Sequence, residues 1–430
     1  MKSFFVPCSW FLVPPACLAL AFSVAIDLNA ANNEPSTKNQ EQETEPYRPE
    51  AGKFPPLEKA HAYRGELVFV DHATRRGSIR LQGSGMFFRN DPHPFALLPY
   101  GIVRYHGAPA DLRDVPLGTV MHVRAFLPPD PKTSSVPVLP VDSKTKDANH
   151  NRGAGIAPAE NHVLLLEDEP SHCRREGKVW KLKEVGLKDR AGTIIARCEP
   201  KDGADGKATE ETMTFDAATR VWRGRELLGV GDLIAEGTWP AEGTKPLADQ
   251  IALLGITWKP TPDGVFTRFH ISDLWLDDAS MDHAAARQTE THKAFIRSRW
   301  MPASIDAVEY GRFGRATVTA TLFGGMDETL YADFVKGASA MMNPVADTLK
   351  HTHGAYGPAH MASRGTLIEV IKTPGEPPLG SSGIQVRFET DLITEGIRPG
   401  NWPQVQVPRE EYINDSLDER FPTPAIFPKY

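Results

Sequence analysis

The sequence predicts a mainly β fold with two or three small antiparallel β-barrels in tandem and one connecting α-helix. The chain of 430 residues contains 35 glycines and 37 prolines. Together these 72 residues are about 17% of the chain, compared with an average share of about 12% for glycine and proline. This excess favours turns and short strands over helical bundles. Segments of alternating hydrophobicity recur in a similar order along the chain. One stretch alone has the capping and stop signals of a long helix.

The net charge of the chain argues against partners that bind through a strong positive charge. The chain has 48 Lys and Arg against 55 Asp and Glu, a net charge of −7. This mild acidity gives no global attraction to nucleic acid or to an anionic membrane. We therefore expect no nucleic-acid partner. The hydrophobic fraction of 40% still permits packed cores.

Residues 1–25 have the pattern of a secretory signal peptide. Lys2 precedes an apolar segment over residues 11–22, and Ser23-Val24-Ala25 offers small residues for cleavage. The alternative is an uncleaved N-terminal helix that anchors the chain, although Pro14-Pro15 would kink it. No later segment approaches about eighteen uninterrupted apolar residues. We expect a secreted or periplasmic protein with no membrane span in the mature chain.

Two segments have the pattern of a linker or a long loop. Residues 26–60 are rich in Asn, Glu, Gln and Pro, which predicts a disordered linker because little apolar surface is available to offset the ordering entropy. Residues 128–161 lie between two apolar segments that are both typical of strands, which predicts a long loop inside the first module.

The recurring strand pattern divides the rest of the chain into modules. In each module a strand ends near an acidic residue, turns through glycine and doubles back, and these strands begin near Gly65, Gly177 and Ala303. The expected modules span residues 61–170, 171–276 and 302–410, followed by a C-terminal tail at 411–430.

The second halves of the first two modules also match. Each contains a strand that ends at a glycine, Gly107 or Gly224. Each then contains a Gly-Thr or Gly-Asp turn, which we expect to begin an alternating final strand over Leu117–Val123 and over Val230–Ala235. About five short strands in a module favour a closed barrel, since closure removes exposed edges.

A connecting helix is predicted over residues 277–301. Asp277-Asp278 can cap its N-terminus, Ala284-Ala285-Ala286 lies inside it and Pro302 stops it. The pattern indicates a spacer that packs across two barrels.

The modules resemble the small OB-like β-barrel modules of unknown function that recur in exported bacterial proteins. The segments Leu117-Gly-Thr-Val-Met121 and Val230-Gly-Asp-Leu-Ile234 carry the resemblance. It covers residues 62–127 and 174–239, with a third copy near 302–408 that has no clear Gly-Asp turn before its final strand. The resemblance implies an exported β protein and supplies no catalytic residues.

The cysteines leave two interpretations open. Cys8 and Cys17 fall in the signal segment, so the mature chain keeps Cys173 and Cys198. A pair in an oxidising compartment favours a disulfide. However, a hairpin turning near residue 189 places Cys198 opposite residue 180, so the chain before residue 178 must fold back for the two to meet. Two free thiols are the alternative.

Three histidines form a candidate metal site. His351 and His353 point to one side if they lie on a strand, and His360 can supply a third ligand for zinc or copper. This would make the chain a metal-dependent hydrolase. The competing interpretation is a solvated loop, because Gly354, Gly357 and Pro358 are typical of one. Apart from zinc in this alternative, we expect no cofactor.

Aromatic and basic residues interleave on two predicted strands of the second module. Such residues can stack on and hold a glycan or an anion. The alternative is that the tryptophans belong to the core and that the basic side chains are the solvated alternate face. The candidate residues are Trp180, Lys181, Lys183, Trp222, Arg223 and Arg225.

Catalytic and nucleotide-binding motifs are missing from the sequence. It contains no Gly-X-Ser-X-Gly, no Gly-Lys-Ser/Thr phosphate loop, no His-Glu-X-X-His and no Gly-X-Gly-X-X-Gly after a strand. The leading hypothesis is therefore an exported, non-enzymatic multi-module β protein of the cell envelope, with a structural or protein-interaction role. Its partner would be an envelope protein or a polysaccharide.

Overall fold

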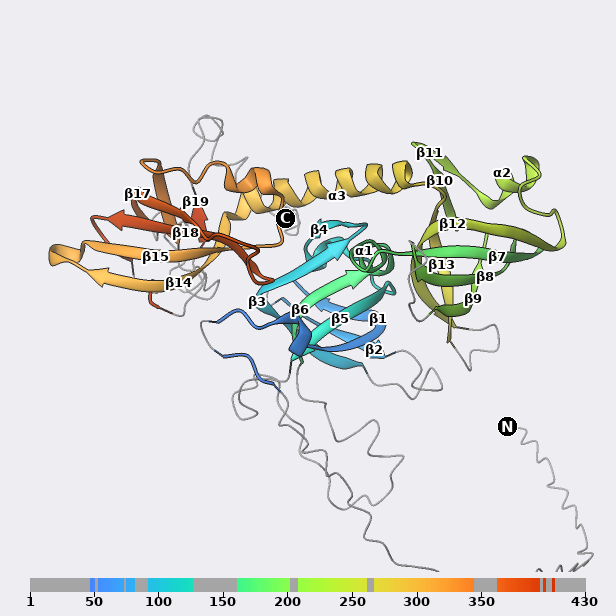
Figure 1. Cartoon of the computed structure of the whole chain (residues 1–430), viewed down its shortest axis with the longest axis horizontal. Coiled ribbons are helices and arrows are strands. Elements are labelled where there is room, and N and C mark those ends of the chain that lie inside the picture. Colours follow the sequence, from blue (N-terminus) through green and yellow to red (C-terminus); the bar gives the residue numbers. More distant parts are fainter. Residues whose placement is uncertain are drawn as a thin grey trace, which may run out of the picture. The chain divides into compact units, whose positions relative to one another are not determined.

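The computed structural model describes residues 47–50, 53–72, 75–81, 92–126, 161–201, 208–260, 267–343, 362–394, 397–399 and 404–406. Within these ranges the chain is mainly β, as the sequence predicts, with strands arranged in curled sheets and closed barrels (Figure 1). The predicted signal peptide, most of the predicted loop at 128–161, the histidines at 351, 353 and 360 and the predicted tail at 411–430 lie outside the described residues.

The first barrel is a ring of five strands, in the order β1-β2-β3-β6-β5, with β4 added beside β3. All neighbours are antiparallel except β3 and β6, which run parallel. A 3-10 helix, η1 (Leu57–Lys59), precedes the ring, and η3 (Leu112–Asp114) lies within it. The strands are β1 (His61–Asp71), β2 (Arg76–Leu81), β3 (His93–Tyr105), β4 (Ala108–Ala110), β5 (Val120–Phe126) and β6 (Asn161–Asp168).

The second barrel has the ring order β7-β8-β9-β13-β12, and β9 and β13 close it in parallel through Thr214 and His270. The hairpin β10–β11 extends the sheet, because β10 also pairs in parallel with β13. Helix α1 (Glu169–Arg175) leads into this barrel, and α2 (Val230–Ala235) follows β11. The strands are β7 (Lys178–Lys188), β8 (Ala191–Pro200), β9 (Thr209–Phe215), β10 (Arg220–Arg223), β11 (Glu226–Leu228), β12 (Gly243–Pro260) and β13 (Thr267–Trp275).

The third barrel is closed in the order β14-β15-β18-β17-β16-β19. All of its pairings are antiparallel, so its topology differs from that of the first two rings. The 3-10 helices η5 (Arg312–Gly314) and η6 (Glu328–Tyr331) lie between its strands. The strands are β14 (Met301–Tyr310), β15 (Ala316–Phe323), β16 (Ser339–Asn343), β17 (Ser363–Lys372), β18 (Ser381–Thr390) and β19 (Gln404–Gln406).

Helix α3 (Asp278–Arg299) occupies the stretch in which the sequence predicts a helix. The carboxylate of Asp277 accepts a hydrogen bond from the Ser280 N–H at 2.7 Å and so caps its N-terminus. The helix ends at Arg299, because the next residue, Trp300, has a φ of 69°, outside the helical region. Gln288 of α3 donates to the Asp114 carboxylate of the first barrel at 3.1 Å. Among the described residues, none of the helices combines the length and the hydrophobicity of a membrane span.

Each barrel has its own apolar core, and each first hairpin carries a β-bulge directly after a buried aliphatic side chain of that core. These side chains are Leu67, Leu182 and Ile305. Because a bulge bends its strand and increases the local twist, it helps a short strand to curl into a barrel.

The structure differs from the sequence prediction at Val230–Ala235, which is helix α2 and not a final strand. The Gly229 N–H donates to the Asp232 carboxylate at 2.7 Å, which satisfies an N–H group at the start of the helix. The Gly-Asp pair therefore begins a helix here. The final strands of this barrel are β12 and β13 instead.

Part of the predicted disordered linker packs against the first barrel. The Tyr47 ring lies 5.6 Å from that of Phe126, and the Phe54 ring lies 4.9 Å from that of Tyr100. The composition argument fails for this part of residues 26–60, because a few well-placed aromatic side chains supply apolar contact that an average over the segment hides.

Candidate functional site

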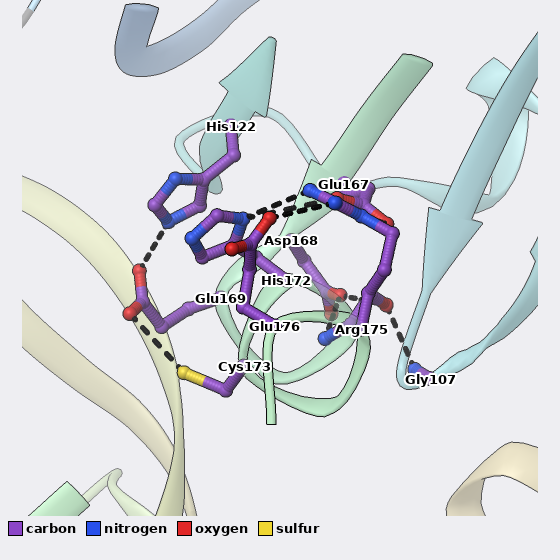
Figure 2. A network of polar contacts seen from close by, with 10 residues as sticks. Gly107, His122, Glu167, Asp168, Glu169, His172, Cys173, Arg175 and Glu176 are labelled. Carbon is purple, nitrogen blue, oxygen red and sulfur yellow. Dashed lines mark hydrogen bonds and ion pairs between the residues drawn. The ribbon is translucent and has the colours of Figure 1, made fainter. Parts of the chain in front are cut away.

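A buried polar cluster lies where β6 passes into α1, between the first and second barrels (Figure 2). Three consecutive acidic residues, Glu167, Asp168 and Glu169, are each no more than 2% exposed. Carboxylates that are buried without a partner strongly destabilise the folded state. The role of the cluster therefore depends on the groups that pair with these three side chains.

Asp168 fastens a turn of the first barrel to α1. Its side chain caps α1 by accepting from the Ser171 N–H at 3.1 Å, and it also accepts from the His106 N–H at 2.8 Å. The Ser171 hydroxyl in turn accepts from the Gly107 N–H at 2.8 Å. Burial raises the pKa of Asp168 to about 7, although these hydrogen bonds act in the opposite direction.

Glu167 is held by α1 itself. The Nε atom of Arg175 donates to its two carboxylate oxygens at 2.8 and 3.0 Å, and His172 Nδ1 lies 3.8 Å from Oε2. Burial by itself would raise the pKa of Glu167, but His172 and Arg175 outweigh it and lower the pKa below its ordinary value. Glu167 is therefore ionised and paired.

Glu169 is the centre of the cluster. Its Oε2 atom accepts from Arg64 at 2.8 Å and lies 2.7 Å from His122 Nε2, while its Oε1 atom accepts from the Trp180 indole at 3.1 Å. Burial opposes ionisation, but Arg64 and His122 hold the pKa of Glu169 well below its usual range. The His122 ring also stacks on the His172 ring at 3.7 Å between centroids.

Arg64 of β1 joins the two barrels. Besides Glu169 it contacts Glu211 of β9 at 2.9 Å, and its guanidinium lies 4.5 Å from the centroid of the Phe269 ring in β13. Burial would lower the pKa of Arg64, but Glu169 and Glu211 raise it above its ordinary value. Thr119 and Thr257 add a β-bridge between the same two barrels.

Cys173 and Cys198 lie beside Glu169. One ligand atom from each of the three residues falls within 4.8 Å of the others, and both cysteines are free thiols in this structure. The Cys173 thiol donates to Glu169 Oε1 at 3.6 Å. A hydrogen bond between the sulfurs, with burial and Glu169, raises the pKa of the Cys173 thiol, while the same hydrogen bond lowers that of Cys198.

This group can in principle hold a soft metal ion or form a disulfide. Two thiolates and a carboxylate are acceptable zinc ligands. However, both oxygens of Glu169 already accept hydrogen bonds from Arg64 and Trp180, and a dication would lie next to the guanidinium of Arg64. The donor set therefore fits a metal poorly.

The structure does not gather the predicted glycan- or anion-binding residues on one face. Trp180 is 1% exposed and belongs to the core of the second barrel. Strands β7 and β10, which carry most of the set, are not neighbours in the sheet. The Trp222 indole donates to Asp273, Lys181 pairs with Glu199, Lys183 with Asp249 and Arg223 with Glu236, whereas Arg225 is exposed between β10 and β11.

Of the residues in and beside this cluster, only Cys173, Cys198 and Trp180 are among the candidate site residues predicted from the sequence. A local signal exists, since Glu167-Asp168-Glu169 follows the apolar run Val163–Leu166 without a break. Acidic residues that continue a buried strand require partners. Nothing local indicates that Arg64 and His122 supply them. Comparisons of the chain with protein-family models, curated proteins and solved structures found no match.

Proposed function

We propose that the chain is an exported, non-enzymatic multi-barrel protein of the bacterial cell envelope with a structural or protein-interaction role. The observation that carries the proposal is the Arg64 bridge, in which one guanidinium binds Glu169 and Glu211 from two sides of the junction. These buried charges pair with one another and not with a substrate, and so they hold the two barrels together. Such coupling is what a scaffold protein requires. The apolar N-terminal segment supports export.

The first two barrels are, in this proposal, OB-like modules. The strand order of both rings supports this, because each follows the sequence 1-2-3-5-4 of its main strands and has a parallel pair between the third and the fifth. A five-stranded Greek-key barrel is the architecture of the OB-fold. The third barrel shares with them the bulged first hairpin and differs in ring order.

The end of the third barrel offers a surface for a protein partner. Phe313 is 95% exposed and has a φ of 59°, in the left-handed region that L residues rarely adopt. Tyr310 and Leu392 are also largely exposed, and Leu392 lies close to Gly314. An exposed aromatic side chain on a strained backbone gains from burial against another protein.

Export and partner binding can be tested separately. After expression in a Gram-negative host, cell fractionation and N-terminal sequencing should find the chain outside the cytoplasm and without its first 25 residues or so. A photo-crosslinking amino acid at position 313 should yield an adduct of discrete mass with an envelope protein. The matched control is position 227, since Leu227 is 56% exposed on the second barrel. An intact Met1 on a cytoplasmic chain would contradict export, and equal yields at the two positions would contradict the binding surface.

A further inference from the structure

The thiols of Cys173 and Cys198 meet although they come from different kinds of element. Cys173 lies on α1, and Cys198 lies on β8 directly opposite Trp180 of β7. Helix α1 folds back so that the two sulfurs and a Glu169 oxygen fall within 4.8 Å of one another. The chain before β7 therefore folds back onto the hairpin, as it must for Cys173 to reach Cys198.

We propose that Cys173 and Cys198 form a disulfide bond that ties α1 to β8 and locks the junction between the first two barrels. The inference relies on the proposed export only for the oxidising compartment in which the chain meets its oxidant. The surroundings tolerate the bond. Oxidation removes the Cys173 S–H donor from Glu169, but Arg64, His122 and Trp180 still bind that carboxylate.

The burial of the two cysteine residues gives the order of the reaction. Cys198 is only partly buried, whereas Cys173 is fully buried. The Cys198 thiolate attacks a low-molecular-weight disulfide such as oxidised glutathione, forms a mixed disulfide and releases one glutathione thiolate. The Cys173 thiolate then attacks the Cys198 sulfur and releases the second. Two thiol protons are lost, and the two electrons reduce glutathione disulfide to two glutathione thiols.

The bond is detectable by peptide mapping despite Cys8 and Cys17. Trypsin cleavage after Arg152, Arg174, Arg197 and Lys201 isolates the two cysteines on the peptides 153–174 and 198–201. The purified full chain is equilibrated in a buffer of oxidised and reduced glutathione, free thiols are blocked with iodoacetamide, and the digest is analysed by mass spectrometry. We expect most of the 198–201 peptide to be linked to 153–174.

Two variants and a stability measurement complete the test. Cys173→Ser should abolish the linked peptide and leave Cys198 either alkylated or as a mixed disulfide with glutathione. Cys198→Ser should also abolish the linked peptide. The oxidised wild type should melt about 5 °C above the reduced form, a difference that the variants should lack. The proposal fails if less than a tenth of the 198–201 peptide is linked. It also fails if stoichiometric zinc occupies the wild type and is lost from both variants. Because the chain is oxidised in vitro, either result is independent of whether the chain is exported.

Discussion

Nη1 of Arg64 lies 2.9 Å from Oε1 of Glu211, so that a single ion pair links strand β1 of the first barrel to strand β9 of the second. Replacing Arg64 with Met should destabilise the protein by about 3–5 kcal/mol, because two largely buried carboxylates then lose their cation. Arg64→Lys keeps the charge but cannot bind two carboxylates as a planar fork does, so an intermediate loss is expected.

Denaturant unfolding measures these changes, and Arg223→Met is the matched control. Arg223 pairs with Glu236 at 2.9 Å, but both side chains are about two-fifths exposed, so we expect a loss below about 1 kcal/mol. Equal losses for Arg64→Met and Arg223→Met would show that the Arg64 bridge does not stabilise the junction.

The turn glycines give a second prediction. Gly107 and Gly224 have φ values of 75° and 57°, as expected for glycines in tight turns. Replacing either with Val should cost more than about 1 kcal/mol. Gly231 lies inside α2 without a positive φ or a close neighbour, so Gly231→Ala should stabilise by about 0.5–1 kcal/mol. Thermal melts of the three variants test this, and a destabilising Gly231→Ala would argue against the helix.

Acid should weaken the second barrel through His270, which pairs with Thr214 where the ring closes. Burial lowers the pKa of His270 to about 4, with Lys259 acting in the same direction and Asp216 opposing it. The unfolded chain takes up this proton near pH 6.5, whereas in the folded chain His270 stays neutral at that pH. The stability gained from neutral His270 is therefore present above about pH 6.5 and lost as the pH falls toward 4, by on the order of 2 kcal/mol.

The variant His270→Gln isolates this contribution from other titrating groups. It should flatten the fall in free energy of unfolding between pH 7 and pH 4 relative to the wild type. His283→Gln, at an exposed position of α3, should retain the wild-type slope. Urea unfolding at several pH values provides the measurement, and parallel curves for all three proteins would refute the assignment.

At Phe313 we expect a substitution to glycine to stabilise the protein. Because its backbone is in the left-handed region and its side chain is almost fully exposed, Phe313→Gly should stabilise the isolated protein by about 1 kcal/mol. Phe313→Ala keeps the strain and should change stability little. A calorimetric melt compares the two. A lower melting temperature for the glycine variant would mean that Phe313 supports the fold.

The parts of the fold that depend on neighbouring residues could be predicted from the sequence. The hairpin that turns at Asp189-Arg190 has both residues at positive φ, and its register sets Cys198 opposite Trp180, as the pattern indicates. Alternation and turn chemistry act over a few residues, so a single sequence contains them.

Two similar motifs show where local inference stops. Leu117-Gly-Thr leads into strand β5, whereas Val230-Gly-Asp begins helix α2. The Thr119 hydroxyl donates to the Pro116 carbonyl at 2.8 Å, while Asp232 accepts from the Gly229 N–H. The two turns thus differ in their side-chain hydrogen bonds and in the element that follows, although their sequences are similar.

The junction could not be predicted because its partners are distant in sequence. Arg64 precedes Glu169 by 105 residues and Glu211 by 147. On a strand, an arginine that will lie in a buried cluster has the same local pattern as one that faces solvent. Only the packing of one barrel on another distinguishes them.

The ring order of the third barrel determines how much of the chain must be complete before that barrel can close. Its closing strand β19 joins β14 through Met301 and Val405, so the barrel is an open sheet with free edges at β14 and β16 until the last of these residues has been made. The first two rings are complete by Asp168 and Trp275. Pairing across such a long stretch is slow, and unpaired edges invite wrong partners. Of the three rings, the third is therefore closed by the paired residues that lie farthest apart in the sequence.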